Sequence, residues 1–374
     1  MIRHRPTVAE VDLDAVRHNV RAIRPARAEV MAVVKANGYG HGAEHVARAA
    51  LEAGATWLGV ALVEEGVRLR DAGLTAPILV LTEFPPGSEK EAVAAGLTPT
   101  LYTAEGVGRL AEAASAVAGG PIGVHVKVDT GMHRVGVAAA DALGLVGGVV
   151  DAGLELEGFW THFAKSEDLD DPFTEVQLGR FLDLVDRLGA GGIRPRYLHA
   201  ANSAATLAHP ASQLDLVRVG LAMYGLLPGL QLAGSADLRP AMSWRSAVTL
   251  ARRVGAGERI SYGLRYRLDR ESTIATVPVG YADGYGRLLG ERAHVLIRGR
   301  RHPVAGTITM DQLMVDCRDD PVEAGDEVVL MGRQGDQEIT AEDLAAWMGT
   351  VNYEAVCMVS ERVPREYVNG MEGE

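Results

Sequence analysis

The chain has 374 residues, 47% of them hydrophobic, which is enough for two domains or for one large barrel with an appendage. It carries 37 Lys and Arg against 49 Asp and Glu, a formal net charge of -12. This charge argues against nonspecific binding to nucleic acid or to an anionic membrane surface. Small molecules and protein partners remain as ligands.

The N-terminal stretch MIRHRPTVAEVDLDAV has basic residues but no apolar segment behind them, and no stretch approaches the roughly 20 apolar residues of a membrane helix. We therefore expect a cytoplasmic protein that does not bind a membrane. The two cysteines, Cys317 and Cys357, are too few for a disulfide framework and lack metal-ligand spacing to each other. No metal site is predicted.

From residue 12 to about residue 225, one pattern recurs: a helical segment ends on glycine, and a short apolar run follows, as in LEAGATWLGVAL and DAGLELEGFWTHF. Strands alternating with helices at this spacing indicate an α/β fold, the (β/α)8 TIM barrel, with a doubly wound open sheet as the alternative. The predicted strands are residues 30–35, 57–62, 77–82, 99–103, 122–128, 156–162, 196–200 and 215–219.

Chemically active side chains stand at or just after the carboxyl ends of these predicted strands, where barrels build their active sites. They come from five of the eight strands, so a barrel would bring them to one mouth. They are Lys35, Lys127, Asp129, Arg134, His162, Asn202, Ser203, Arg218 and Gly220.

After the Gly- and Pro-rich segment GLLPGLQLAGSADLRP the pattern changes. From Met242 onward the runs SAVTLARRV, STIATVPVG, HVLIRG, TITMDQLMVDC and EVVLMG follow one another with short turns and little helix before AEDLAAWMG. We predict a barrel over residues 12–236 and a mainly β domain over residues 237–374, which residues 1–11 are expected to join.

Lys35 ends the first apolar run, in VVKANGYGHG, and the chain has only four lysines. A lysine at a strand end can form a Schiff base if desolvation lowers its pKa from about 10.4; the alternative is a lysine that reaches out to solvent. Ser203 and Gly220 follow the seventh and eighth strands, where barrels commonly bind phosphate, and Tyr39 could reach the same anion. This combination indicates pyridoxal phosphate or a sugar-phosphate aldolase.

Arg218 ends the run LDLVRVG, so its side chain is expected to point into the barrel mouth. The alternative role is a buried ion pair with a carboxylate such as Asp215. Opposite a pyridine nitrogen, an arginine would not give up its proton, and the ring would stay unprotonated. Such a ring disfavours transamination and leaves removal and return of a proton at Cα as the reaction.

The sequence resembles the alanine racemase family of fold-type III pyridoxal-phosphate enzymes in nine ordered segments. They are VVKANGYGHG, KVDTGMHRVG, THFA, HAANSAA, RVGLAMYG, SYG, VGYADGYGR, TITMDQ and VNYE. The resemblance implies interconversion of L-alanine and D-alanine by two bases, which supplies D-alanine for peptidoglycan. It also implies pyridoxal 5′-phosphate as cofactor and a homodimer with shared active sites.

By this resemblance, Lys35 would hold the cofactor and act as one base, and Tyr262 of the partner subunit would be the other. The implied cofactor contacts are Tyr39, His162, Ser203, Arg218, Gly220 and Tyr353. The other implied roles are substrate-carboxylate contacts at Arg134 and Met310, a carbamylated Lys127, and corridor gates at Tyr281 and Asp311. One departure is His133, where the family usually has a small or uncharged residue before the arginine.

Three rival functions stay open from the sequence. A racemase of another small amino acid, such as serine, has the same requirements. A fold-type III decarboxylase is disfavoured by Arg218, because decarboxylation benefits from a protonated ring. A non-catalytic pyridoxal-phosphate carrier would have no use for a second domain that bears Tyr262 and Met310.

Overall fold

The computed structural model describes residues 5–116 and 122–370, and these form two compact units. The barrel unit consists of Val16–Gly38 and Ala43–Arg239. The β unit consists of residues 5–15, Tyr39–Gly42 and residues 240–370.

Eight parallel strands make the barrel unit, in the order β10-β2-β3-β4 and β5-β6-β8-β9. Two contacts join these groups of strands. A parallel bridge links Leu79 of β4 to Thr98, just before β5, and the backbone N–H of Asp215, just before β10, donates to the carbonyl oxygen of Leu198 in β9. The strands are β2 (Glu29–Val33), β3 (Trp57–Val60), β4 (Ile78–Val80), β5 (Thr100–Leu101), β6 (Gly123–Asp129), β8 (Glu155–Trp160), β9 (Tyr197–His199) and β10 (Leu216–Val219), with a short β7 (Val137–Ala138) beside β6.

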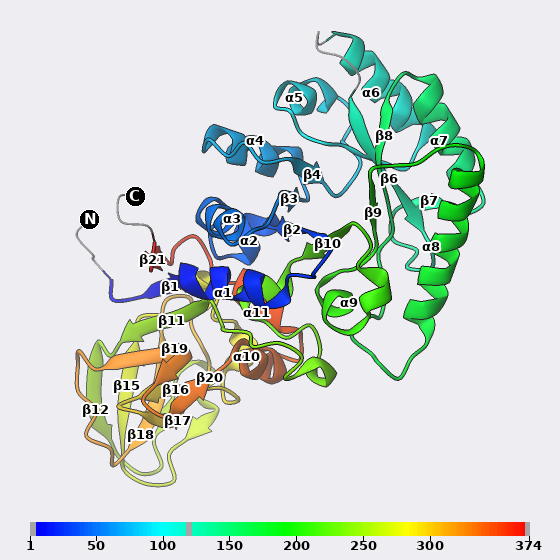
Figure 1. Ribbon diagram of the computed structural model, residues 1–374. Helices are drawn as coiled ribbons and strands as arrows, with labels where there is room; N and C mark the ends of the chain where they lie inside the picture. Colours follow the sequence, from blue (N-terminus) through cyan, green and yellow to red (C-terminus); the bar gives the residue numbers. More distant parts are fainter. Residues whose placement is uncertain (1–4, 117–121, 371–374) are drawn as a thin grey trace. The chain divides into compact units, whose positions relative to one another are not determined.

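Helices alternate with these strands and lie along their outside (Figure 1). They are α1 (Leu13–Ile23), α2 (Lys35–Tyr39), α3 (Ala43–Glu52), α4 (Val63–Asp71), α5 (Glu89–Ala94), α6 (Ala104–Ala116), α7 (Ala142–Asp151), α8 (Phe173–Ala190) and α9 (Ser203–Ala208), with 3-10 turns η1 (Pro210–Ser212), η2 (Leu221–Tyr224) and η3 (Leu230–Leu232). All eight predicted strands of the barrel are present, because strands buried on both faces appear in the sequence as continuous apolar runs.

Large side chains of the barrel strands pack against one another and form a hydrophobic core. Met31, Trp57, Leu79, Tyr197 and Leu216 form one buried cluster. Burying side chains of this size stabilises the fold by about 1.5–3 kcal/mol each. The rigid strands beneath the mouth therefore hold the side chains at their carboxyl ends in place.

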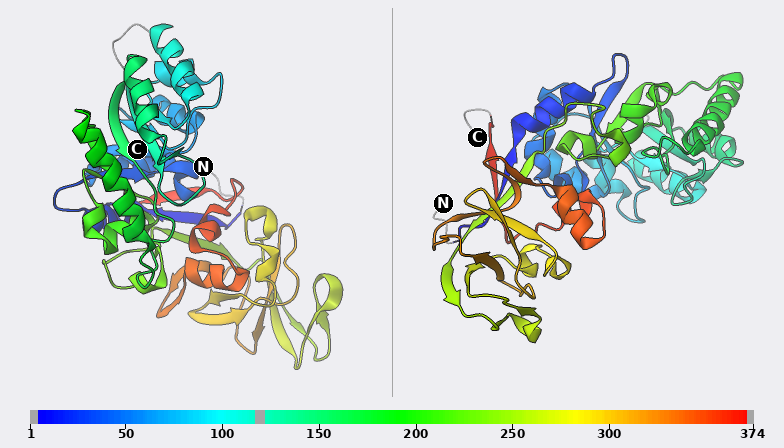
Figure 2. Two further views of the ribbon diagram at one scale, coloured as in Figure 1. Left: turned by 90° about the vertical axis from the view of Figure 1, so that its right-hand side faces the viewer. Right: turned by 90° about the horizontal axis from the view of Figure 1, so that it is seen from below.

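The β unit is built mainly from strands with short turns, as its sequence predicts (Figures 1 and 2). One sheet has the order β17-β16-β19-β11-β1-β21 with β20 on β19, a second is β12-β15-β18, and β13 pairs with β14. The strands are β1 (Val8–Asp12), β11 (Met242–Ala247), β12 (Leu250–Val254), β13 (Arg259–Ile260), β14 (Tyr266–Arg267), β15 (Ser272–Val277), β16 (His294–Ile297), β17 (Arg300–Pro303), β18 (Leu313–Arg318), β19 (Glu327–Gln334), β20 (Gln337–Ile339) and β21 (Arg365–Val368).

The N-terminal strand β1 belongs to this unit because it pairs with β11 and with β21. Short helices follow between the strands and near the end of the unit. They are η4 (Tyr262–Leu264), η5 (Tyr281–Asp283), η6 (Arg287–Leu289), α10 (Ala341–Met348) and α11 (Asn352–Cys357). Within the described residues, no helix is both long and apolar enough to cross a membrane.

The run TITMDQLMVDC, one of the runs that indicated a mainly β domain, is only partly a strand. Strand β18 starts only at Leu313, because Thr309 and Gln312 close a turn in front of it. The backbone N–H of Thr309 donates to Gln312 O at 2.9 Å, and that of Gln312 donates to Thr309 Oγ1 at 3.1 Å. Met310 and Asp311 therefore lie at the tip of a turn.

Candidate active site

Lys35 follows β2 and opens a left-handed turn. Ala36, Asn37 and Tyr39 have φ angles of 51°, 52° and 52°, and Gly38 has 62°. Left-handed backbone costs residues other than glycine about 1–2 kcal/mol each, so the surrounding structure has to hold it. The sequence indicated a turn here, but left-handed backbone at three residues other than Gly was not expected.

Two side-chain contacts hold the turn. Glu65 Oε1 accepts the backbone N–H of Ala36 at 2.6 Å, and Asn37 Oδ1 accepts that of Ala43 at 3.0 Å. The half-buried Lys35 side chain is therefore presented by a fixed backbone at the carboxyl end of its strand.

Arg218, on β10, is buried and uses its terminal nitrogens within the barrel. Nη2 donates to the carbonyl oxygens of Thr161 and Ala200, each at 2.8 Å, and lies 3.2 Å from His162 Nδ1. Nη1 donates to His199 Nδ1 at 3.0 Å. Because a guanidinium only donates, both histidine Nδ1 atoms are acceptors and therefore unprotonated.

No carboxylate of the described residues pairs with Arg218, so the ion pair with Asp215 is not formed. Asp215 Oδ2 instead accepts the backbone N–H of Leu198 at 2.9 Å. Burial lowers the pKa of Arg218 to about 9, which leaves the guanidinium charged at neutral pH. Its Nε–H has no acceptor among the described residues, so this donor remains for a ligand.

His162 is kept neutral by its surroundings. Burial, followed by the charges of Arg218 and Lys127, lowers the pKa of this imidazole well below its ordinary value. With Nδ1 accepting from Arg218, the proton of the ring is on Nε2. His162 is therefore a neutral donor beside the arginine.

Lys127 lies among cations. Burial, followed by the charges of Arg218 and Arg134, lowers its pKa to about 7. Its Nζ lies 4.5 Å from the centre of the Trp160 ring, and Arg218 lies 4.6 Å from the same ring. Much of Lys127 is therefore a neutral amine near pH 7, and a negative charge placed on it would meet positive neighbours.

Ser203 and Gly220 meet at one point. Ser203 Oγ accepts the backbone N–H of Gly220 at 3.0 Å and that of Ala222 at 3.3 Å. Ser203 begins α9, and Asn202 caps this helix by accepting the backbone N–H of Ala205 at 3.0 Å. Because the Ser203 oxygen accepts these two bonds, its hydroxyl proton is left to donate to an anionic group.

Arg134 is exposed on the loop that follows β6. Asp129 organises this loop, because its Oδ1 accepts the backbone N–H groups of Gly131, Met132 and His133 at 2.8, 3.0 and 3.1 Å. Although burial opposes it, hydrogen bonding from Gly131 and His133 lowers the pKa of Asp129. The carboxylate is thus charged and holds the loop.

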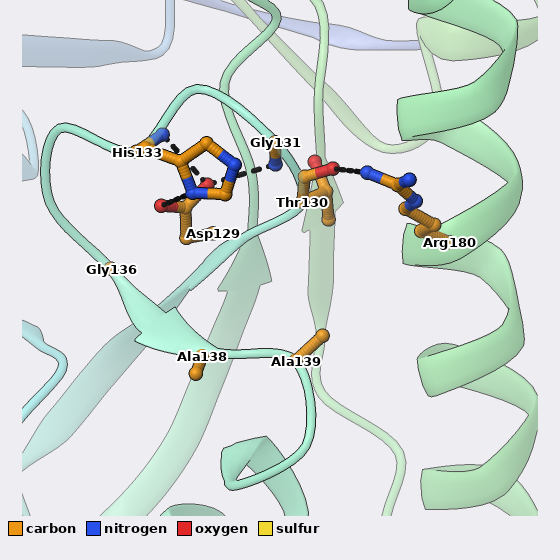
Figure 3. A pocket seen from close by; sticks show the side chains of 8 residues that line it. All are labelled: Asp129, Thr130, Gly131, His133, Gly136, Ala138, Ala139 and Arg180. Atoms are coloured by element: carbon orange, nitrogen blue, oxygen red, sulfur yellow. Dashed lines mark hydrogen bonds and ion pairs between the residues drawn. The ribbon is translucent and has the colours of Figure 1, made fainter.

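The unusual His133 lies beside Asp129 (Figure 3). Its ring Nδ1 lies 3.3 Å from Asp129 Oδ2, its side chain is 84% exposed, and its φ is 57°. It lines a cavity of about 310 Å³ with Asp129, Thr130 and Arg180, and Arg180 donates to Thr130 O at 2.8 Å. The residue therefore adds a side-chain contact to Asp129, the carboxylate that also accepts the backbone N–H of His133.

In the β unit, three predicted residues lie together. The backbone N–H of Tyr281 donates to Thr309 O at 3.0 Å, and Ala282 N–H donates to Met310 O at 3.1 Å. Asp311 Oδ1 accepts from Arg362 at 2.8 Å. The predicted gate residues and Met310 thus share one hydrogen-bonded corner of this unit.

Tyr262, Tyr39 and Tyr353 also lie in the β unit. Tyr262 is 74% exposed in a turn fixed by Thr307, whose Oγ1 donates to Tyr262 O at 2.9 Å. Tyr353 is exposed at the start of α11, and Tyr39 is half-buried. Tyr262 is therefore accessible to another molecule.

Sequence reasoning gave no role to Trp160, His199, His125 or Glu157. Trp160 stacks on His199 with ring centres 5.3 Å apart and 9° between the planes. One signal was present: His125 stands two residues before Lys127 in the run GVHVKVD, so a strand places both on the same face.

Comparison with known proteins identifies the family. Residues 11–228 match the alanine racemase N-terminal domain, and residues 241–367 match the alanine racemase C-terminal domain. The chain belongs to the alanine racemase family. The resemblance seen in its motifs is thereby confirmed.

Individual relatives agree over the whole length. An alanine racemase of Symbiobacterium thermophilum is 51% identical over 368 residues, 97% of each chain. The crystal structure of alanine racemase from Streptomyces lavendulae has a TM-score of 0.95 at 42% identity and covers 100% of this chain and 99% of its own. A histidine racemase from Leuconostoc mesenteroides has a TM-score of 0.89 at 30% identity, covering 98% and 99%. The predicted fold, a barrel followed by a β-rich C-terminal region, is confirmed.

Alanine racemases depend on pyridoxal 5′-phosphate, and the barrel residues fit this group. Arg218 offers an Nε–H without an acceptor among the described residues, facing neutral histidines and no carboxylate. The Ser203 hydroxyl, whose oxygen accepts two amides, has its proton left to donate to the phosphate, and Lys35 follows a barrel strand.

Proposed function

We propose that this protein is a pyridoxal-phosphate-dependent alanine racemase that interconverts L-alanine and D-alanine and supplies D-alanine for peptidoglycan. The observation that carries the proposal is the buried Arg218. It is charged, it has no carboxylate partner among the described residues, and two histidine nitrogens accept its hydrogen bonds. An arginine in this state keeps an opposing ring nitrogen unprotonated, which favours proton exchange at Cα over other cofactor reactions.

The chain's own residues would then do the following. Bound pyridoxal phosphate supplies an aldehyde for the substrate amino group and a ring that stabilises negative charge at Cα. Lys35 and Tyr262 remove and return the proton at Cα from opposite sides, and this inverts the configuration. Arg134 and the backbone of Met310 bind the substrate carboxylate, and Tyr281 and Asp311 control access.

The remaining cofactor contacts follow the same proposal. Tyr39, Ser203, Gly220 and Tyr353 bind the phosphate. The support from the structure is at Ser203, whose oxygen accepts the amides of Gly220 and Ala222 and whose hydroxyl proton is left to donate. His162 acts as a neutral hydrogen-bonding neighbour of Arg218.

We further propose a homodimer in which each active site takes Tyr262 and Met310 from the other subunit. The support is exposure, because Tyr262 is 74% and Met310 52% accessible on the β unit. Contact with a second copy of the chain would remove these two large side chains from water. For the chain itself we propose domains over 12–236 and 237–374, the latter with residues 1–11, and a cytoplasmic location.

We also propose that Lys127 is carbamylated. The neutral amine attacks carbon dioxide, the new N–C bond forms, and one amine proton is released to solvent. Its lowered pKa supplies the nucleophilic neutral amine near pH 7. The resulting negative charge lies near Arg218 and Arg134, so it replaces repulsion by attraction.

The lowered pKa of the free Lys127 amine leads to a prediction about stability. In buffer free of carbon dioxide, the folded-state pKa of Lys127 is about 7 against an ordinary value of 10.5. Between these values the unfolded chain holds more protons, so the free energy of unfolding should rise with pH, by up to about 1.4 kcal/mol per unit. Below about pH 7 the full penalty applies. Urea unfolding at pH 7.5, 8.5 and 9.5 measures this rise.

The Lys127→Met variant should lack the rise, and bicarbonate should stabilise the wild type but not the variant. Lys165→Met is the matched control. Lys165 pairs with Asp168 and Asp171 at the surface, so its effect should be constant over this pH range. A difference between Lys127→Met and wild type that is the same at every pH would contradict the assignment.

The function is tested by circular dichroism of the purified protein loaded with pyridoxal phosphate. Optical activity should be lost from L-alanine and from D-alanine, each ending in equal amounts of both enantiomers. Serine, lysine and histidine are tested alongside, because a histidine racemase shares this fold. Faster racemisation of serine or histidine would change the substrate, carbon dioxide release from lysine would indicate a decarboxylase, and no turnover at all would indicate a carrier.

A further inference from the structure

A file of buried polar groups leads from Arg218 down the inside of the barrel. Arg218 Nη1 lies 3.0 Å from His199 Nδ1, and His199 Nε2 lies 2.9 Å from His125 Nδ1. His125 Nε2 lies 3.7 Å from Glu157 Oε2. Both histidines have no exposed surface, whereas the Glu157 side chain is 22% exposed.

The direction of every hydrogen bond in this file follows from its first member. Arg218 donates, so His199 Nδ1 is unprotonated and His199 carries its proton on Nε2. His199 Nε2–H then donates to His125 Nδ1, which leaves the proton of His125 on Nε2. That N–H faces the Glu157 carboxylate, so both ends of the file favour the same arrangement.

The two rings are neutral. Burial is the first cause that lowers the pKa of His125, and burial followed by the charge of Arg218 lowers the pKa of His199 well below its ordinary value. At 3.7 Å, Glu157 acts on His125 through its charge and not through a hydrogen bond, and His125 Nε2 has no hydrogen-bond partner among the described residues.

The backbone is shaped for this contact. Leu156 pairs with Val124 and Gly158 pairs with His125, so Glu157 is the extra residue of a β-bulge on β8. Bulges re-aim side chains. A Cβ at Gly158 would lie 2.3 Å from His125 Nδ1, so only glycine leaves space for the ring.

We propose that Glu157, acting through His125 and His199, is a positioning residue for Arg218. Its carboxylate keeps the proton of His125 on Nε2, and this preserves His199 Nδ1 as the acceptor that orients the guanidinium. The reversed arrangement would set His199 Nδ1–H against Arg218 Nη1–H and break this hydrogen bond. The inference deepens the proposed racemase function and rests on it for its kinetic part.

The test is Glu157→Gln in the holoenzyme, with Glu155→Gln as control. The side chain keeps its size, but its amide can donate to His125 Nε2 and so favours the reversed arrangement. Glu155 lies two residues away on the same strand, is exposed, and loses the same charge. Long-range ¹H–¹⁵N spectra of the histidine rings report which nitrogen is protonated, and the melting temperature checks folding.

We expect Glu157→Gln to give His125 and His199 signals of the Nδ1–H form and to lower kcat about tenfold at unchanged KM, the lower end of losses at outer partners of metal sites. Glu155→Gln should match wild type in both. Unchanged histidine signals in Glu157→Gln would overturn the proposal, and so would changed signals with unchanged kcat. If the wild type does not racemise, the proposed function fails, and the histidine spectra still decide whether Glu157 sets these protons.

Discussion

Replacing Lys35 by alanine is expected to remove racemisation, with a loss of more than about 10³-fold, because the same amine holds the cofactor and serves as a base. The visible absorbance band of a cofactor joined to lysine should disappear as well. Absorbance spectra and circular dichroism with both alanine enantiomers measure the two effects. Melting temperature should change little, since Lys35 is half-buried in a turn held by Glu65 and Asn37.

Two further variants test whether the amine of Lys35, and not merely a positive charge or any lysine, is required. Lys35→Arg keeps a cation but has no amine that can bond to an aldehyde, so it should be as inactive as Lys35→Ala. Lys90→Ala removes an exposed lysine on α5 and should keep full activity. Racemisation at wild-type rate by either Lys35 variant would remove this lysine from the mechanism.

The barrel could be predicted from sequence because its physical signal is local. Residues 215–219 and 77–82 were predicted as strands, and β10 and β4 lie within them. Each is a short apolar run that follows a helical segment, and burial on both faces requires this composition. The same regularity put Lys127 and Arg218 at strand ends, where the structure finds them together around Trp160.

The features of the site that the sequence did not predict depend on irregular backbone. The bulge at Glu157 turns a side chain that strict alternation would have placed on the opposite face from Gly158. The left-handed turn at Ala36 and Asn37 is supported by Glu65, which lies far along the sequence. Neither feature has a signature in composition or periodicity, because both are set by tertiary contacts.

Mixing two inactive variants tests whether the active site is shared between subunits. If Lys35 and Tyr262 act in the same site but come from different chains, a heterodimer of Lys35→Ala with Tyr262→Phe has one site with both residues intact. Random reassociation makes half the dimers mixed, so activity should recover to about a quarter of wild type. Co-expression with two affinity tags isolates the mixed dimer, and its rate, measured by circular dichroism with L-alanine, should be about half that of wild type because one of its two sites is intact.

Tyr262→Phe alone adds a directional control. Lys35 still faces one side of Cα, so deuterium from solvent should enter one alanine enantiomer much faster than the other, while little product of opposite configuration forms. Equal exchange from both enantiomers would remove Tyr262 from the role of base.

The mixing result also distinguishes two positions for Tyr262. Were it to act in the barrel of its own chain, both sites of the mixed dimer would lack one base, and mixing would restore nothing. The 74% exposure of Tyr262 favours the shared site, because its own chain leaves this side chain accessible to a partner subunit. Recovery near a quarter in the mixture, or near half in the isolated mixed dimer, would therefore mean that dimerisation completes the active site. Dilution below the dimer dissociation constant should then abolish activity in the wild type.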